Sequence, residues 1–147
     1  MPATGLNRRT LLLTLLAPLA RADEAGEVYD VFAELATSLS ASDAAGFMRP
    51  FESSMSGYDE LRRNVTALCS QSEVTSSVGV VDETGDKNAQ AVELDWLLQV
   101  RTNDSTGGFV RRREIVKCRL ERKGKRWKIT SLEPIPFFAP IRPDQGR

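Results

Sequence analysis

The sequence contains no histidine among its 147 residues. Histidine most often supplies a general base near neutral pH, and its imidazole is the commonest metal ligand. Its absence excludes His-based activation of a serine or cysteine nucleophile, imidazole metal sites and Asp/His catalytic dyads. We therefore expect no metal and no cofactor.

The sequence also lacks a hydrophobic run long enough to cross a membrane. Its most apolar stretch, Leu11–Leu19, is about half of the roughly 20 residues that a membrane-spanning helix needs. Leucines surround the helix axis there and Pro18 interrupts it, so a core helix with one apolar stripe is disfavoured as well. No membrane span is expected.

A signal peptide accounts for this segment. The basic pair Arg8–Arg9 precedes the apolar run, and Ala20–Ala22 has the form of an A-x-A cleavage site. This pattern predicts a cleavable signal peptide over residues 1–22 and a mature protein that begins at Asp23. It also predicts a periplasmic or secreted bacterial protein.

The export route stays open. The stretch RRTLL at Arg8–Leu12 resembles the twin-arginine export signature. Leu11 stands where that signature usually has Phe, and the usual Lys is absent, so the general secretory route is the alternative.

Cysteine is scarce, with two residues in the chain. Cys69 and Cys118 are both expected on apolar faces. An oxidising compartment would permit a disulfide between them, whereas two buried free thiols are the alternative.

Charge of each sign is unevenly distributed. Residues 23–104 hold 16 acidic and 5 basic side chains, whereas residues 105–147 hold 4 acidic and 12 basic ones. The basic residues alternate with apolar ones as in a strand, so we expect internal pairing of the two halves and no nucleic-acid partner. Arg111 and Arg113 are expected on the solvent face, opposite acidic residues of a neighbouring strand.

Helical periodicity dominates the first half of the mature chain. Apolar residues at helical spacing predict a helix over residues 24–40. A short second helix is expected from an N-cap at Ser42 to about Pro50, and a third helix from an N-cap at Ser56.

Strand periodicity dominates the second half. Alternating or β-branched residues predict strands over residues 73–81, 89–101, 109–122 and 126–135, separated by turn residues. Helices followed by an antiparallel meander predict an α+β fold in which a curved sheet packs its inner face on a helical layer.

Four stretches carry a family resemblance: GYDELRRNV at Gly57–Val65, VELDWLLQVR at Val92–Arg101, the segment Arg112–Pro134 with its RWKI strand, and FFAP at Phe137–Pro140. With them the chain resembles the NTF2-like, or SnoaL-like, cone fold of the cystatin-like group. The resemblance implies an NTF2-like domain over residues 23–140, with a disordered tail at residues 141–147. It leaves function open, because that family includes isomerases, dehydratases, transport adaptors and immunity proteins.

The cone fold would enclose a mostly apolar pocket between helices and sheet. Its expected lining consists of Tyr29, Phe32, Tyr58, Leu61, Trp96, Leu98, Glu114 and Val116. Glu114 is the one carboxylate expected on the inner sheet face. It is either the base of a ketosteroid-isomerase-like reaction, which the resemblance permits, or the partner of Arg112 in a structural ion pair, which we favour.

Three functions remain open. The first is an exported, non-catalytic domain that binds a small apolar molecule or a protein partner. The second is a small isomerase or dehydratase that uses Glu114. The third is a dimerisation or scaffold module, a homodimer formed through the sheet.

Processing of the leader is directly testable. Protein recovered from the exported fraction is expected to begin at Asp23, as measured by intact mass or N-terminal sequencing. If Arg8,Arg9→Lys,Lys blocks export, the route is twin-arginine, whereas unimpeded export indicates the general secretory route. Retention of Met1 or Pro2 in the exported protein would contradict the prediction.

Overall fold

The computed structural model describes residues 25–104 and 107–142. The predicted signal peptide, and residues 143–147 of the predicted tail, lie outside this part of the chain, so export and location stay predictions. The chain divides into two compact units, residues 1–30 and 31–147. In the first unit, the described residues 25–30 form the start of a helix that continues to residue 40.

The second unit contains the rest of that helix, residues 31–40, and the short helix α2, Ala44–Met48. Asp43 caps α2, because its carboxylate accepts a hydrogen bond from the Gly46 N–H at 2.9 Å. The expected cap at Ser42 was therefore wrong by one residue. Ser42 instead takes a left-handed conformation, φ 57°, in the turn between the two helices.

Helix α3 spans Tyr58–Gln71. The expected cap at Ser56 was wrong, because Gly57 occupies the N-cap in a left-handed conformation, φ 81°, without a side-chain cap. A Cβ atom at Gly57 would clash with Ile135 Cδ1, so the Ile135 side chain would have to move, in addition to the conformational cost of a left-handed residue. Asp59 and Glu60 lie in the first turn, where negative charge favours the helix dipole.

Four antiparallel strands form one sheet in the order β1-β2-β3-β4. They are β1 Ser72–Gly85, β2 Ala89–Thr102, β3 Phe109–Lys123 and β4 Arg126–Glu133. A bulge at Val81 interrupts the β1–β2 register, and another at Thr130 interrupts β3–β4. Strand β4 pairs with β3 only from Lys117 onward, so the first half of β3 has a strand partner on the β2 side alone.

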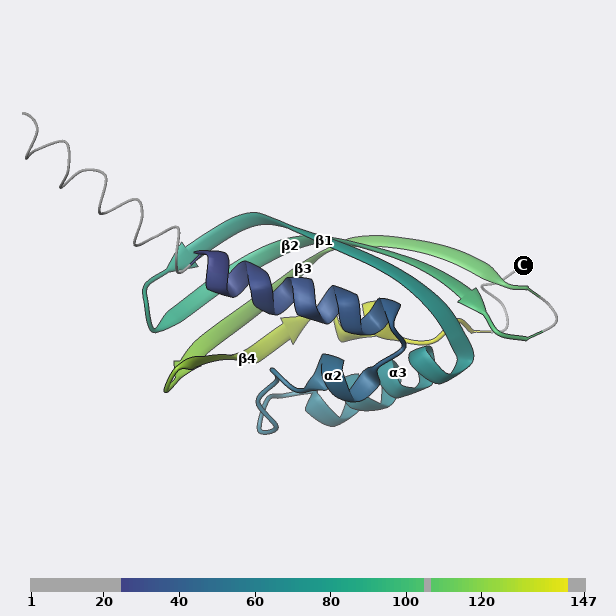
Figure 1. The fold of residues 1–147 in the computed structure, drawn as a ribbon, viewed down its shortest axis with the longest axis horizontal. Coiled ribbons are helices and arrows are strands. Elements are labelled where there is room, and N and C mark those ends of the chain that lie inside the picture. Colours follow the sequence, from purple (N-terminus) through teal and green to yellow (C-terminus); the bar gives the residue numbers. More distant parts are fainter. Residues whose placement is uncertain (1–24, 105–106, 143–147) are drawn as a thin grey trace, which may run out of the picture. The chain divides into compact units, whose positions relative to one another are not determined.

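The sheet bends over the helices, which lie along one of its faces (Figure 1). We call this the inner face and the opposite side the outer face. The inner side chains of β2 are fully buried, because they alternate with polar outer residues and meet the apolar faces of the helices. The predicted α+β architecture is confirmed.

Strand β4 is also joined to the end of α2. Phe51 forms an isolated parallel bridge with Ile129, the Ile129 N–H donates to the Pro50 carbonyl at 2.8 Å, and the Glu52 N–H donates to the Ile129 carbonyl at 2.9 Å. These hydrogen bonds fix the position of the α2 end against the sheet.

Gly57 and Gly124 give a matched pair for testing the α3 cap. Both are left-handed, with φ 81° and φ 65°, but only Gly57 has a neighbour where a Cβ would lie. Gly124→Ala is expected to lower the free energy of unfolding by about 1 kcal/mol, the conformational cost alone. Gly57→Ala is expected to lower it by about 2 kcal/mol or more, as measured by urea denaturation. Equal losses would contradict the role given to Ile135.

Candidate functional site

An aromatic cluster fills the inner face at the centre of β2. The Trp96 ring is fully buried, and its indole N–H donates to Ser76 Oγ on β1 at 2.8 Å. Phe138 meets Trp96 edge to face with ring centroids 5.0 Å apart, and Phe47 of α2 lies 5.4 Å from Phe138. Edge-to-face and tilted pairs of this kind are favourable ring arrangements. The cluster therefore occupies the region of the inner face where a ligand of Trp96 would bind.

The C-terminal segment supplies Phe138. After a cis Glu133–Pro134 bond, residues Ile135–Phe138 form the 3-10 helix η1, with Phe137 and Phe138 both buried. Sequence reasoning did not place this segment inside the fold. The signal was the apolar pair in FFAP, but no periodicity indicates which interior position such a short segment reaches.

Arg112 holds this segment. It lies on the inner side of β3, half-buried, and its Nη1 donates to the carbonyl oxygens of Phe137, at 3.0 Å, and Ala139. Its Nη2 donates to the Pro140 carbonyl at 3.3 Å. Burial lowers the pKa of Arg112 and the nearby Arg142 cation lowers it further, but a guanidinium stays protonated at neutral pH. A cation thus binds three carbonyl groups where an ion pair with Glu114 was expected.

Glu114 lies opposite Trp96 in the β2–β3 register, yet its side chain is exposed. Its neighbours on the inner side of β3 differ, since Arg112 is half-buried and Val116 is fully buried. The structure gives Glu114 no ion pair and no side-chain hydrogen bond with the described residues, and this includes Arg112 and both tyrosines. The alternative of an ion pair with Arg112 is corrected accordingly, and the dry carboxylate that an acid–base mechanism needs is not formed here.

The other expected lining residues divide into two groups. Those that are fully buried in the packed core are Phe32, Leu61, Trp96, Leu98 and Val116. Tyr58 at the start of α3 is half-buried, and Tyr29 on the first helix is 50% exposed. The structure brings Trp96 together with Phe47 and Phe138, which sequence reasoning missed.

The two cysteines are free thiols in the structure, and a disulfide between them after export stays a prediction. Cys69 lies on α3 and Cys118 on β3, each buried among its own neighbours. Burial raises the pKa of both thiols, and the Asp43 carboxylate raises that of Cys69 further. The thiolate form that attacks disulfides or binds metal is therefore disfavoured at both positions.

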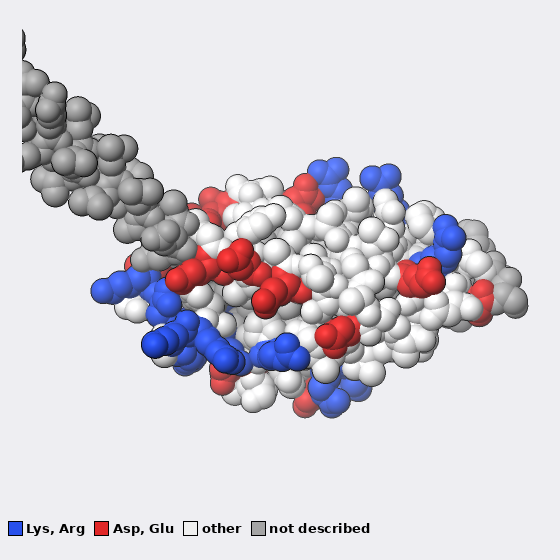
Figure 2. All heavy atoms as spheres, viewed as in Figure 1, with Lys and Arg blue, Asp and Glu red and all other residues white. Residues whose placement is uncertain are grey.

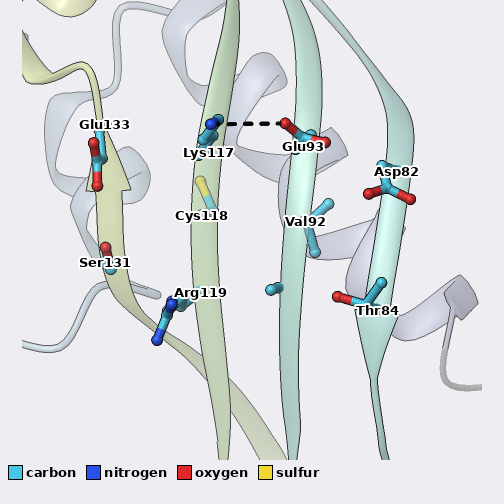
Figure 3. Close-up of a pocket in the computed structure, with 10 residues that line it drawn as sticks. Asp82, Thr84, Val92, Glu93, Lys117, Cys118, Arg119, Ser131 and Glu133 are labelled. Atoms are coloured by element: carbon cyan, nitrogen blue, oxygen red, sulfur yellow. Dashed lines mark ion pairs between the residues drawn. The ribbon is translucent and has the colours of Figure 1, made fainter.

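The outer face carries a polar hollow of about 290 Å³ between strands. Ala91 leaves space at its centre, and charged side chains from all four strands surround it, namely Asp82, Glu93, Lys117, Arg119 and Glu133 (Figure 3). Lys117 Nζ lies 4.0 Å from Glu93 Oε1, a partly exposed pair that contributes little stability. The acids come from β1, β2 and β4 and the bases from β3, so both signs of charge surround this hollow.

A second hollow, of about 380 Å³, lies further along the outer face. Arg113 binds Asp95 there in a bidentate pair at 2.9 and 2.7 Å, as the predicted pairing of basic and acidic halves required. This hydrogen-bonded pair lowers the pKa of Asp95, so the carboxylate is ionised at neutral pH. Gly79 opens the hollow, because a side chain would meet nothing within 4 Å.

Apolar side chains surround the Arg113–Asp95 pair on this face. Val81, at the β1 bulge, is 57% exposed and Ile115 is 48% exposed. Leu97, directly opposite Arg113, is half-buried. We call Val81, Leu97 and Ile115 the outer apolar patch.

The described residues contain no cluster of three or more side chains suited to a metal. Within the same residues, no helix has the length and apolar character to span a membrane.

Solved structures share this fold. A scytalone-dehydratase-like protein from Novosphingobium aromaticivorans DSM 12444 is 8% identical with a TM-score of 0.68, over 76% of this chain and 83% of that chain. The LinA-type3 hexachlorocyclohexane dehydrochlorinase from Novosphingobium barchaimii LL02 is 12% identical with a TM-score of 0.62, over 78% and 87%. An NTF2-like protein with a cystatin-like fold from Novosphingobium aromaticivorans is 13% identical with a TM-score of 0.60, over 80% and 84%.

These likenesses identify the fold as NTF2-like, of the cystatin-like group, and the resemblance in the sequence is confirmed at the level of fold. No protein-family model matches the sequence, and no curated protein matches it either. At such low identity the shared fold carries no activity over to this chain.

Arg112 and its neighbour Arg111 test the hold on the C-terminal segment. Arg112→Gln is expected to lower the free energy of unfolding by about 1–3 kcal/mol, because three carbonyl groups lose a charged donor. Arg111→Gln, an exposed position with the same loss of charge, is expected to change it by less than about 0.5 kcal/mol. Urea denaturation measures both.

Hydrogen exchange of the Phe137 and Phe138 backbone amides measures how firmly the C-terminal segment itself is held. Faster exchange there in Arg112→Gln than in the unchanged protein is expected. Unchanged exchange would contradict the role of Arg112.

Proposed function

We propose that this protein is a non-catalytic binding domain that associates through the outer face of its sheet, with a second copy of the chain as the partner. The observation that carries the proposal is the contrast between the two faces. The inner face is packed against helices and the aromatic cluster, whereas the outer face presents the exposed members of the outer apolar patch. Exposed apolar side chains bordered by polar ones favour protein contact.

The charge pattern of the outer face favours a like partner. Asp95 with Arg113 and Glu93 with Lys117 place both signs side by side on neighbouring strands. In a twofold interface the same surface meets itself, so it must be self-complementary. A face that carried mainly one sign of charge would repel the same face of a second copy. A face that carries both signs around an apolar centre can pair with its own copy.

A small apolar ligand in the interior is less well supported. Such a ligand would have to displace Phe138, and with it the hydrogen bonds that Arg112 donates to the segment. It would also gain no donor from Trp96, whose indole N–H already binds Ser76.

The enzymatic alternative rests on the fold, since structural neighbours include a dehydratase-like protein and a dehydrochlorinase. Glu114 is the residue that this alternative would use. Its exposure, and the absence of a tyrosine hydroxyl beside it among the described residues, favour binding over catalysis.

Sedimentation measurements on the mature protein test the proposal. We expect the mass to rise from monomer to dimer as concentration increases. Ile115→Arg is expected to weaken the dimer by about tenfold or more, because it places a charge in the apolar centre of the interface. Because Ile115 is half exposed in one chain, the fold should survive, and a thermal melt checks this.

Thr66→Arg is the matched control, since it adds the same charge at an exposed position of α3. It should leave dimerisation unchanged. A protein that stays monomeric at all concentrations, or equal weakening by the two substitutions, would contradict the proposal.

A further inference from the structure

The β3–β4 hairpin is strongly basic, and of its basic side chains Arg119 alone lines the outer-face hollow described above. Residues 119–128 hold six basic side chains and one acidic one. Lys and Arg side chains gather over the turn of this hairpin (Figure 2). Six like charges so close together repel one another, and a negatively charged partner would relieve this repulsion.

A hollow of about 360 Å³ opens beside this hairpin. It is lined by Val31, Glu34, Gly46, Arg49, Pro50, Arg126, Trp127 and Lys128. Its volume lies in the range of small-molecule sites. It therefore combines three cations with the apolar surfaces of a valine, a proline and a tryptophan.

Backbone hydrogen bonds fix the two walls of the hollow. Arg49 follows α2, and Arg126 and Lys128 belong to β4, far away in sequence. The bridge between Phe51 and Ile129 joins these segments, and Lys128 Nζ donates to the Arg49 carbonyl at 3.0 Å. The backbone segments that carry the three cations are thus held side by side, and the Arg49 and Arg126 side chains stay exposed.

Two of these cations are available for a ligand. Arg49 and Arg126 are exposed, and neither makes an ion pair with the residues that the structure describes. Arg122 differs, because its guanidinium lies 4.7 Å from the centre of the Trp127 ring and its Nε donates to the Lys87 carbonyl. Glu34 is the one acid in the lining, so the formal charge of the hollow is positive.

We propose that this hollow binds a small organic anion, with its oxyanion group between Arg49 and Arg126 and its apolar body against Trp127, Pro50 and Val31. Guanidinium groups bind carboxylate and phosphate oxygens in bidentate fashion, so both head groups suit the site. The apolar wall distinguishes this ligand from inorganic phosphate. The site is separate from the interior around Trp96 and from the outer apolar patch.

NMR of the two tryptophan indoles locates binding, because the chain has two tryptophans. Phenyl phosphate and benzoate serve as probes. Phenol is the control for the apolar body without a charged head group, and inorganic phosphate is the control for the head group without the apolar body. We expect phenyl phosphate or benzoate to shift the Trp127 indole signal and to leave that of Trp96 unchanged. Trp127→Phe assigns the two signals.

Charge variants test the role of the arginines. Arg49→Gln combined with Arg126→Gln is expected to weaken binding by about tenfold or more. Arg63→Gln combined with Arg111→Gln, two exposed arginines outside the lining, removes the same charge and should leave affinity within about twofold. Glu34→Gln removes the one repelling carboxylate and should strengthen binding.

Each remaining outcome overturns the proposal. A shift at Trp96 would place the ligand in the interior instead. If inorganic phosphate binds as tightly as phenyl phosphate, the apolar wall contributes nothing to binding. If the two double variants weaken binding equally, the loss of affinity comes from net charge alone. If the protein and its variants still dimerise when anion binding fails, the proposed dimerisation stands although the proposed anion site does not.

Discussion

The hydrogen bonds from Arg112 to the C-terminal segment determine what the interior of this domain can do. A guanidinium half-buried on a sheet needs acceptors, and carbonyl oxygens of Phe137, Ala139 and Pro140 supply them. The segment that carries these carbonyls also carries Phe138, which enters the space between Trp96 and Phe47. The polar and apolar contacts of one short segment thus reinforce each other, and together they fill the inner face.

This arrangement bears on the acid–base chemistry that the fold could support. Lyase chemistry on such a fold requires a base inside a dry cavity. Here Glu114, the carboxylate considered as a base, is exposed, and the aromatic cluster fills the centre of the inner face. The surfaces that remain free are the outer face, with its mixed charges, and the basic hairpin. The inner face of the sheet is thus packed, whereas side chains of the outer face are open to solvent.

The strands were predictable from the sequence because alternation in β2 is nearly unbroken, and every inner residue from Val92 to Val100 is buried. The pairing of Arg113 with Asp95 followed from the same alternation. The position of Glu114 shows the limit of this reasoning. Alternation assigns a side chain to a face, but its exposure depends on what packs against that face, and Glu114 is exposed although Val116 on the same face is buried.

Helix caps and long-range contacts were harder to predict. Ser42 and Ser56 are good caps by residue type, yet Asp43 and Gly57 occupy these positions because the preceding turns are tight and Ile135 lies against the α3 start. The binding hollow beside Trp127 depends on the Phe51–Ile129 bridge, a contact between segments that no local pattern connects. The residue types indicated a basic hairpin, whereas the hollow beside that hairpin forms through tertiary contacts.

The unequal lengths of β3 and β4 have a consequence for how copies of this protein meet. Residues Phe109–Val116 have a strand partner on one side alone, and a free strand edge normally invites another strand to join it. Arg111, Arg112 and Arg113 stand along this edge, so two copies that approached edge to edge would bring six positive charges together. Continuous sheet growth from copy to copy through this stretch of β3 is thereby disfavoured.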